Sequence, residues 1–293
     1  MRALRIRGGA KALPAAWGEL IRRRGKLILM AGALDGRVVV IIGGTAGLGL
    51  SAAEASIGAG AQIVAVGRED ESIAVARAKL KSAAHVLAAD ATDPQTAQRA
   101  VELAMREFGR FDALYHVAGG SGRRMGDGPL HEITDEGWRK TIDLNASSMF
   151  YSNRAAVRQF LSRKTPGSVL NLSSVLAYSP SPRHFATHAY AAAKATAIGL
   201  TTTCAAYYAP HGIRFNLLAP GLVDTPMARR AAEDEAIRRY ITTKQPLDGG
   251  RIGRPEDLDA AVVFFLSDQS RFITGQILAI DGGWSVTEGR ADP

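Results

Sequence analysis

The chain has 293 residues, of which 46% are hydrophobic and 22% charged, a composition typical of a globular α/β domain. Its formal net charge is +8, but residues 1–29 hold eight basic residues and one acidic residue, so the remainder is nearly neutral and no nucleic-acid partner is expected. A single cysteine, Cys204, excludes an intrachain disulfide, and no run of 18 apolar residues offers a membrane span. The six histidines show no zinc-binding spacing, so no metal site is expected.

The basic segment 1–29 is expected to be an extension that precedes a main domain at residues 30–293. Pro14 and Gly25 enclose apolar residues at helical spacing, which predicts a short amphipathic helix over about 14–24. This helix could dock on the main domain, make weak contact with an anionic membrane, or belong to a targeting peptide. Alternatively, translation begins at Met30. We expect the segment to be dispensable for the activity of the main domain.

Seven short, continuously apolar runs predict strands that are buried on both faces. They are Val38–Ile42, Gln62–Val66, His85–Ala89, Ala113–Val117, Ser168–Leu172, Ile213–Leu217 and Gln276–Ile280. Helical patterns lie between them, near residues 48–59, 70–82, 94–108, 134–163, 188–209 and 255–267. This alternation favours a single domain with a mostly parallel, seven-stranded sheet and helices on both faces. The sequence therefore predicts a doubly wound, Rossmann-type α/β fold.

The first predicted strand runs directly into a glycine-rich turn, IIGGTAGLGL. Gly43, Gly47 and Gly49 stand between this strand and a helix that begins near Leu48. Glycines allow a tight turn and a close approach of the backbone to a pyrophosphate, and a helix N-terminus supplies free N–H groups. The motif indicates a dinucleotide site, although a purely structural turn has the same pattern.

The end of the second predicted strand bears on the choice of cofactor. An acidic residue at this point binds the adenosine ribose of NAD, whereas an arginine accommodates the 2′-phosphate of NADP. The acidic position is Gly67 and the next residue is Arg68, so NADP(H) is favoured. Glu69 and Asp70 follow directly and would weaken this preference, which leaves NAD(H) open.

A tyrosine and a lysine stand four positions apart in HAYAAAK. Alanine favours helix, so Tyr190 and Lys194 are expected on one face, one turn apart. A neighbouring ammonium favours the phenolate and lowers the pKa of tyrosine from its usual value of about 10. Tyr190 is therefore a candidate general acid/base, although in isolation the pair could simply share an exposed helical face.

Together these motifs resemble those of the short-chain dehydrogenase/reductase family, over residues 35–285. The matching segments, in the family's order, are GGTAGLG at 43–49, Asp90 in LAADATD, Asn145 in DLNASSMF, Ser174 in NLSSVLA, Tyr190 and Lys194 in YAAAK, Pro220 and Gly221 in RFNLLAPG, and the tail RIGRPEDLDAAVVFFLSDQSRFITGQILAIDGG. The resemblance implies that residues 30–293 form an NAD(P)-binding catalytic domain. Such an enzyme transfers a hydride between its nicotinamide cofactor and a carbonyl or secondary alcohol.

The resemblance also implies roles for the matched residues. Tyr190 would move the proton, Lys194 would hold the nicotinamide ribose, Ser174 would bind the substrate oxygen, and Asn145 would position a water beside Lys194. The expected cofactor contacts are Gly43, Thr45, Ala46, Gly47, Leu48, Gly49, Arg68, Asp90, Ala91, Ala118, Gly119, Tyr190, Lys194, Pro220, Gly221, Val223 and Thr225. The predicted helices at 134–163 and 188–209 resemble those by which family members form homodimers and homotetramers. Use of NADP(H) favours the cytoplasm, where that cofactor is kept.

Three features depart from the family's pattern. Ile42 replaces a threonine before the first glycine, and His116 and Val117 replace two asparagines whose amides brace the central strands. Ser174 and Tyr190 are 16 positions apart, which is longer than is common in the family. We expect the first two to affect stability and cofactor affinity, and the third to affect the shape of the pocket.

The sequence constrains the identity of the substrate less than the fold or the cofactor. Three variable segments should frame its pocket: the loop after the fourth strand, the loop between Ser174 and Tyr190, and a lid-like stretch at 222–250. Arg123 and Arg124 could meet an anionic substrate or could be solvated loop residues. A secondary alcohol or ketone is expected, with a 3-oxoacyl thioester as one candidate. A catalytically silent dinucleotide sensor or scaffold on the same fold is the alternative.

Overall fold

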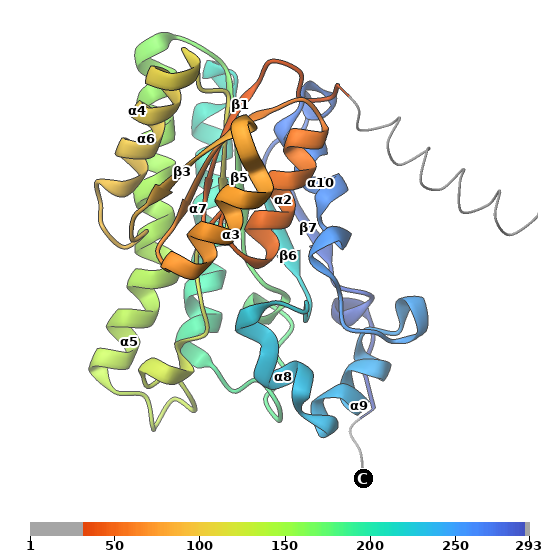
Figure 1. Cartoon of the computed structure of the whole chain (residues 1–293). Coiled ribbons are helices and arrows are strands. Elements are labelled where there is room, and N and C mark those ends of the chain that lie inside the picture. Colours follow the sequence, from red (N-terminus) through yellow and green to blue (C-terminus); the bar gives the residue numbers. More distant parts are fainter. Residues whose placement is uncertain (1–31, 291–293) are drawn as a thin grey trace, which may run out of the picture.

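A seven-stranded sheet runs through the centre of the protein in the computed structural model, which describes residues 32–290 (Figure 1). The strands are β1 (Val38–Ile42), β2 (Gln62–Gly67), β3 (Ala84–Ala88), β4 (Ala113–His116), β5 (Gly167–Leu172), β6 (Ile213–Pro220) and β7 (Ile277–Ile280). They lie in the order β3-β2-β1-β4-β5-β6-β7, and all their pairings in the described sheet are parallel. The strand order reverses between β1 and β4, which opens a crevice at their carboxyl ends.

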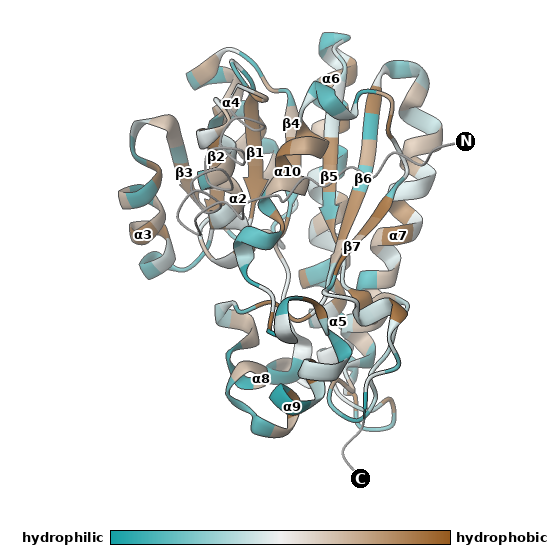
Figure 2. Cartoon of the chain, turned by 90° about the vertical axis from the view of Figure 1, so that its right-hand side faces the viewer, coloured by the Kyte–Doolittle hydropathy of each residue, from teal (hydrophilic) through white to brown (hydrophobic). Residues whose placement is uncertain are grey.

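Helices cover both faces of the sheet. One face packs against α2 (Gly47–Gly58), α3 (Asp70–Leu80) and α10 (Asp259–Leu266), and the other against α4 (Thr96–Phe108), α6 (Ser148–Arg163) and α7 (His188–Tyr208). Three further helices, α5 (Asp135–Ile142), α8 (Arg229–Glu233) and α9 (Glu235–Lys244), lie beyond the carboxyl ends of the strands (Figure 2). The described residues thus form the predicted doubly wound fold in one domain.

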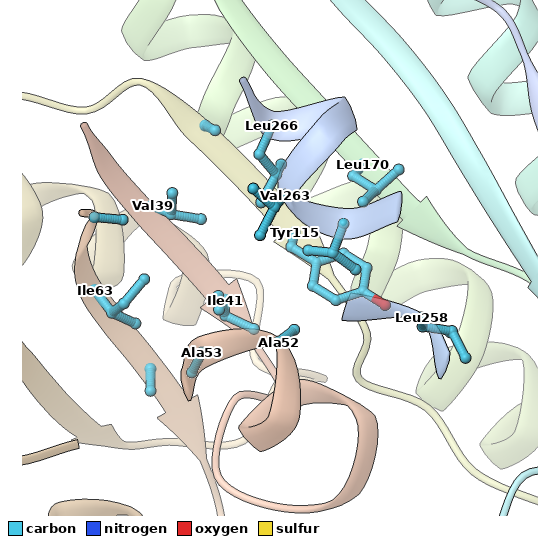
Figure 3. Packing of buried hydrophobic residues seen from close by; sticks show 14 of the residues in the cluster. Val39, Ile41, Ala52, Ala53, Ile63, Tyr115, Leu170, Leu258, Val263 and Leu266 are labelled. Atoms are coloured by element: carbon cyan, nitrogen blue, oxygen red, sulfur yellow. The ribbon is translucent and has the colours of Figure 1, made fainter. Parts of the chain in front are cut away.

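The two faces of β1 belong to two separate hydrophobic clusters. Val39 and Ile41 pack with Ala53 of α2 and Val263 of α10, as Figure 3 shows. Val38, Val40 and Ile42 pack with residues of α4 and α6 in the second cluster. Each position of the strand is therefore buried, which explains why VVVII is continuously apolar rather than alternating.

The structure differs from the predicted elements in three places. The helix predicted over 134–163 is interrupted by a π-helical turn at Asp143–Ser147. The helices α8 and α9 were not predicted, because their sequence was interpreted as a lid-like stretch. Strand β6 continues to Pro220, which has no N–H to donate but takes part in the parallel pairing with Ile280. The predicted extension 1–29 and the domain start at residue 30 lie outside the described residues.

Within residues 32–290, no helix is long and apolar enough to cross a membrane. The same part of the chain holds no cluster of three or more histidine, cysteine, aspartate or glutamate side chains arranged to bind a metal ion.

Candidate active site

A cavity of about 440 Å³ lies at the carboxyl ends of the central strands. Its wall includes Gly43 after β1, Ala118 after β4, Ser174 after β5 and Gly221 after β6. Every residue that the sequence analysis proposed for cofactor binding lines this cavity, together with Ser174, Tyr190 and Lys194. Asn145 is the exception, because it lies behind the wall.

The glycine-rich turn packs closely against its surroundings because its glycines have no side chains. Gly43 has a φ of +92°, and a Cβ added there would lie 2.7 Å from the backbone nitrogen of Ala118. A Cβ on Gly49 would collide with the carbonyl oxygen of Gly43, so the turn and the start of α2 are packed together without side chains. No side chain in the described structure caps the N-terminus of α2. Its first N–H groups are therefore free for an anion, and the turn fits the pyrophosphate of a dinucleotide.

A small polar cluster surrounds the end of β2. The guanidinium of Arg68 donates to Oε1 of Glu69 at 2.8 Å and to Oδ2 of Asp90 at 3.2 Å, and its side chain is 60% exposed. The hydroxyls of Thr45 and Ser72 lie 2.9 Å apart beside it. A Cβ on Gly67 would collide with Oγ1 of Thr45. An acidic side chain at position 67 therefore has no space unless the side chain of Thr45 moves.

Asn145 is held in the π-helical turn between α5 and α6. Its Nδ2 donates to the carbonyl oxygens of Gly120 at 2.9 Å and Thr141 at 3.0 Å, and its Oδ1 accepts from the N–H of Gly120 at 3.0 Å. A Cβ on Gly119 would lie 2.6 Å from this same oxygen and 3.1 Å from Nζ of Lys194. The π turn, a feature that recurs at functional sites, thus fixes Asn145 against the loop that separates it from the cavity.

Ser174, Tyr190 and Lys194 meet at the centre of the site. Ser174 follows β5, and its hydroxyl forms a hydrogen bond with the phenol of Tyr190. Tyr190 and Lys194 lie on α7, with Nζ of Lys194 5.7 Å from the centre of the Tyr190 ring. Nζ also donates to the carbonyl oxygen of Leu172 at 3.0 Å. The i, i+4 spacing on α7 places the phenol and the ammonium on one face of the helix, as the sequence predicted, and the end of β5 brings the hydroxyl of Ser174 beside them.

Burial dominates the protonation of this group. It raises the pKa of Tyr190 to about 12, with the hydrogen bond from Ser174 opposing the rise, and lowers the pKa of Lys194 to about 8. The sequence-based expectation that Lys194 lowers the pKa of Tyr190 is therefore wrong for this structure. The loss of water around the phenol raises its pKa, and only the hydrogen bond with Ser174 opposes the rise, while the desolvated ammonium of Lys194 donates to the carbonyl oxygen of Leu172.

The long loop between Ser174 and Tyr190 contributes an apolar wall. Leu176 and Phe185 of this loop line the cavity, and the ring of Phe185 packs against Trp284 at 5.6 Å between ring centres. The indole N–H of Trp284 donates to the carbonyl oxygen of Ser179 at 3.1 Å, which ties the loop to the C-terminal segment. The extra loop length thus shapes the pocket, as expected.

The histidine that replaces an asparagine at position 116 takes over a bracing role. His116 is buried, and its Nδ1 lies 2.8 Å from Oγ of Ser152, while its Nε2 lies 3.4 Å from Oγ of Ser148. These contacts link β4 to α6. Burial, followed by the charge of Lys194, lowers the pKa of His116 to about 3, so the ring is neutral at neutral pH. The missing amide is replaced rather than simply lost.

Two residues of the site escaped the sequence reasoning. Asp127 is buried, and its Oδ1 and Oδ2 accept hydrogen bonds from the N–H groups of Ala189 at 2.9 Å and Tyr190 at 3.0 Å. The second residue is Arg230 of α8, which lines the cavity together with Arg123. No local pattern marks either role, because both depend on segments that are distant in the sequence.

The comparisons with known proteins agree with this fold. The family model described as "Enoyl-(Acyl carrier protein) reductase" matches residues 43–285. 3beta-hydroxysteroid dehydrogenase 1 of Eggerthella lenta is 37% identical over 261 residues, covering 87% of this chain and 96% of the relative. Cis-4-hydroxycyclohexanecarboxylate dehydrogenase of Sinomonas cyclohexanicum is 33% identical over 259 residues, covering 87% and 99%. The solved structure of a short-chain type dehydrogenase/reductase from Mycobacterium ulcerans superposes with a TM-score of 0.80 at 29% identity, covering 87% of this chain and 92% of that one.

The fold and the site define an oxidoreductase that acts on alcohol or ketone groups with a nicotinamide dinucleotide. The chain belongs to the short-chain dehydrogenase/reductase family.

Proposed function

We propose that the protein interconverts a ring-bearing secondary alcohol and its ketone, with NADP(H) as the preferred cofactor and Tyr190 as the general acid/base. The observation that carries this proposal is the hydrogen-bonded cluster of Ser174 and Tyr190 beside Lys194, in the same cavity as the glycine-rich turn. The bound cofactor supplies or accepts the hydride, which leaves the protein to bind, orient and move a proton.

Each residue of the cluster has a distinct task in this proposal. Tyr190, whose pKa of about 12 keeps it protonated at neutral pH, donates its phenolic proton to the substrate oxygen during ketone reduction. Ser174 holds that oxygen by a second hydrogen bond. Lys194 holds the ribose hydroxyls of the nicotinamide and supports the phenolate that remains, and Asn145 positions water behind Lys194. The hydrogen bonds of Asn145 to Gly120 and Thr141 hold it behind the cavity wall, where Gly119 lies close to both Asn145 and Lys194.

The end of β2 supports a preference for NADP(H). Arg68 supplies a guanidinium beside the hydroxyls of Thr45 and Ser72, a set of donors suited to a phosphate. The side chain of Thr45 also fills the space that an acidic residue at Gly67 would need in order to bind ribose hydroxyls. Glu69 competes for the same guanidinium, so NAD(H) remains the alternative cofactor.

The lining of the cavity supports a compact apolar substrate. Leu176, Phe185 and Trp284 form one apolar part of its wall. Both relatives described above are named for hydroxyl groups carried on rings. A ring-bearing alcohol or ketone is therefore favoured over the 3-oxoacyl thioester, which is the alternative substrate class.

The test is a panel of cyclic ketones, cyclic secondary alcohols and an acetoacetyl thioester, assayed by nicotinamide absorbance with NADPH and with NADH. We expect turnover of at least one cyclic ketone with NADPH, and its loss in Tyr190→Phe while NADPH binding is retained. Reduction of the thioester alone would overturn the substrate class. NADPH binding without turnover of any compound would identify a sensor or scaffold instead.

We further propose a homodimer or homotetramer that works in the cytoplasm. Large apolar side chains are exposed on α5, α6 and α7, among them Trp138, Phe150 and Tyr207. Their exposure supports burial of these helices against a second copy. Light scattering at micromolar concentration tests the assembly, and a monomer would contradict it.

A further inference from the structure

Two arginines from distant parts of the chain line one end of the cavity. Arg123 follows β4 in the short helix Gly122–Met125, and Arg230 belongs to α8. One nitrogen of Arg123, Nη2, donates to the carbonyl oxygen of His184 at 3.3 Å, which holds the guanidinium against the loop between Ser174 and Tyr190. A guanidinium has five N–H donors, so most of those of Arg123 remain unused.

The two guanidiniums have no acidic partner. Among residues 32–290, the side chain of Arg230 has no hydrogen bond or ion pair, and Arg123 has no ion pair. Burial, followed by the charge of Arg230, lowers the pKa of Arg123, so the two cations repel each other across the cavity. Asp127 opposes this effect only from a distance, since both its carboxylate oxygens accept hydrogen bonds from the start of α7.

The acidic residues of the cavity lie at its other end. Glu69 and Asp90 are the only carboxylates in the described lining, and both are paired with Arg68 beside the cofactor-binding turn. The end that contains Tyr190 therefore holds Arg123, Arg230 and Lys194 with no carboxylate in the described lining, and Asp127 behind it offsets their charge only in part. An anion that enters there would relieve the repulsion and use the free donors.

The surroundings of the arginines limit the kind of anion. Phe185, Ala231 and Trp284 line the cavity and pack in one apolar cluster that includes α8, so an apolar body should accompany the charge. We propose that the substrate carries a carboxylate on a ring-sized apolar body, and that Arg123 and Arg230 bind this carboxylate while Tyr190 faces the reacting oxygen. This inference rests on the proposed function and assigns a substrate class and two specificity-determining residues to it.

The experiment compares 4-oxocyclohexanecarboxylate with 4-oxocyclohexanecarboxamide, which has nearly the same shape but no charge. With NADPH and the full chain, we expect kcat/KM to favour the carboxylate by about 10- to 100-fold, the range for hydrogen bonds to a charged group. Arg123→Gln and Arg230→Gln should each lower kcat/KM for the carboxylate by roughly tenfold and leave kcat/KM for the carboxamide unchanged. The double variant should remove the preference.

Matched controls come from the neighbouring residues. Arg124 and Arg229 stand next to the two arginines, carry the same charge and do not line the cavity. Arg124→Gln and Arg229→Gln should leave the ratio unchanged. A fall equal to that in the cavity variants would show that only the overall positive field matters, and would overturn the assignment of Arg123 and Arg230.

A binding measurement separates this inference from the proposed function. Calorimetric titration of cyclohexanecarboxylate into the NADPH-bound protein should show saturable binding that is absent in the double variant and absent for cyclohexanecarboxamide. Equal binding or turnover of the charged and uncharged compounds would overturn the inference and leave the proposed function intact. If the double variant loses as much affinity for NADPH as for the carboxylate, the inference is also overturned, because the arginines would then bind the cofactor. If no carbonyl compound is reduced, the proposed function fails, and the titration still decides whether the arginines bind a carboxylate.

Discussion

The start of the helix that carries Tyr190 and Lys194 depends on a carboxylate from another part of the chain. α7 begins at His188, and the residue before it, Thr187, provides no side-chain cap. Asp127 provides the cap from 63 positions before Tyr190, whose N–H it accepts at 3.0 Å. Since Asp127 is only 6% exposed, replacing it by alanine leaves the buried N–H of Ala189 and the part-buried N–H of Tyr190 without a partner.

We expect Asp127→Ala to lower both stability and turnover. An unpaired buried N–H costs about 1–3 kcal/mol, and since the N–H of Tyr190 is only part-buried, we expect a total loss of roughly 2–4 kcal/mol. For a domain of this size, that loss lowers Tm by roughly 4–16 °C. Because the first turn of α7 would also fray, kcat should fall while the affinity for NADPH changes less.

Differential scanning fluorimetry and steady-state kinetics on two further variants test this reasoning. Asp127→Asn keeps one acceptor oxygen and should lose about half as much stability. Glu132→Ala removes an exposed carboxylate from the same loop and should stay within about 0.5 kcal/mol of wild type. If Asp127→Ala unfolds at the same temperature as Glu132→Ala, the capping argument is refuted.

Three other predictions follow from the site. Tyr190→Phe should reduce kcat by roughly 100- to 10,000-fold, because the proton donor is lost, with little change in NADPH affinity by titration; near-normal turnover would contradict the mechanism. Arg68→Gln should weaken binding of NADPH relative to NADH by about 1.5–3 kcal/mol, and equal affinities in wild type would show that Arg68 does not select the phosphate. His116→Asn should flatten the acid side of the stability profile. Burial holds the pKa of His116 at about 3, so between about pH 6.5 and pH 3 only the unfolded chain binds this proton. The free energy of unfolding of the wild type should therefore fall as the pH falls. Between pH 7 and 5 it should fall by about 2 kcal/mol more in the wild type than in the variant. Equal slopes in denaturant titrations at the two pH values would disprove this link.

The strands were predictable because the sheet is buried on both faces. In β1, for example, every side chain enters one of two hydrophobic clusters, so the run VVVII stands out from its surroundings without any knowledge of its partners. The interruption between α5 and α6 was not predictable in the same way. The sequence DLNAS continues the helical pattern, and the π turn is fixed by the bonds of Asn145 to Gly120 and Thr141.

The residues of the candidate site also differ in whether a local sequence pattern marks them. Gly43, Gly49, Tyr190 and Lys194 were found because their roles depend on neighbours within one turn or one helix. Asp127 was missed because its partners lie at the start of α7, 62 and 63 positions later. Sequence patterns register local geometry, whereas contacts between loops become visible only when the strands bring the loops together.

Burial also determines the protonation states of Tyr190 and Lys194. The sequence alone suggests an attraction between a phenolate at Tyr190 and an ammonium at Lys194, but burial removes much of the water that would stabilise either charge. The structure accordingly raises the pKa of Tyr190 to about 12 and lowers that of Lys194 to about 8. At neutral pH the phenol keeps its proton and can donate it. In the mechanism proposed above, this protonated phenol is the group that donates to the substrate oxygen when a ketone is reduced.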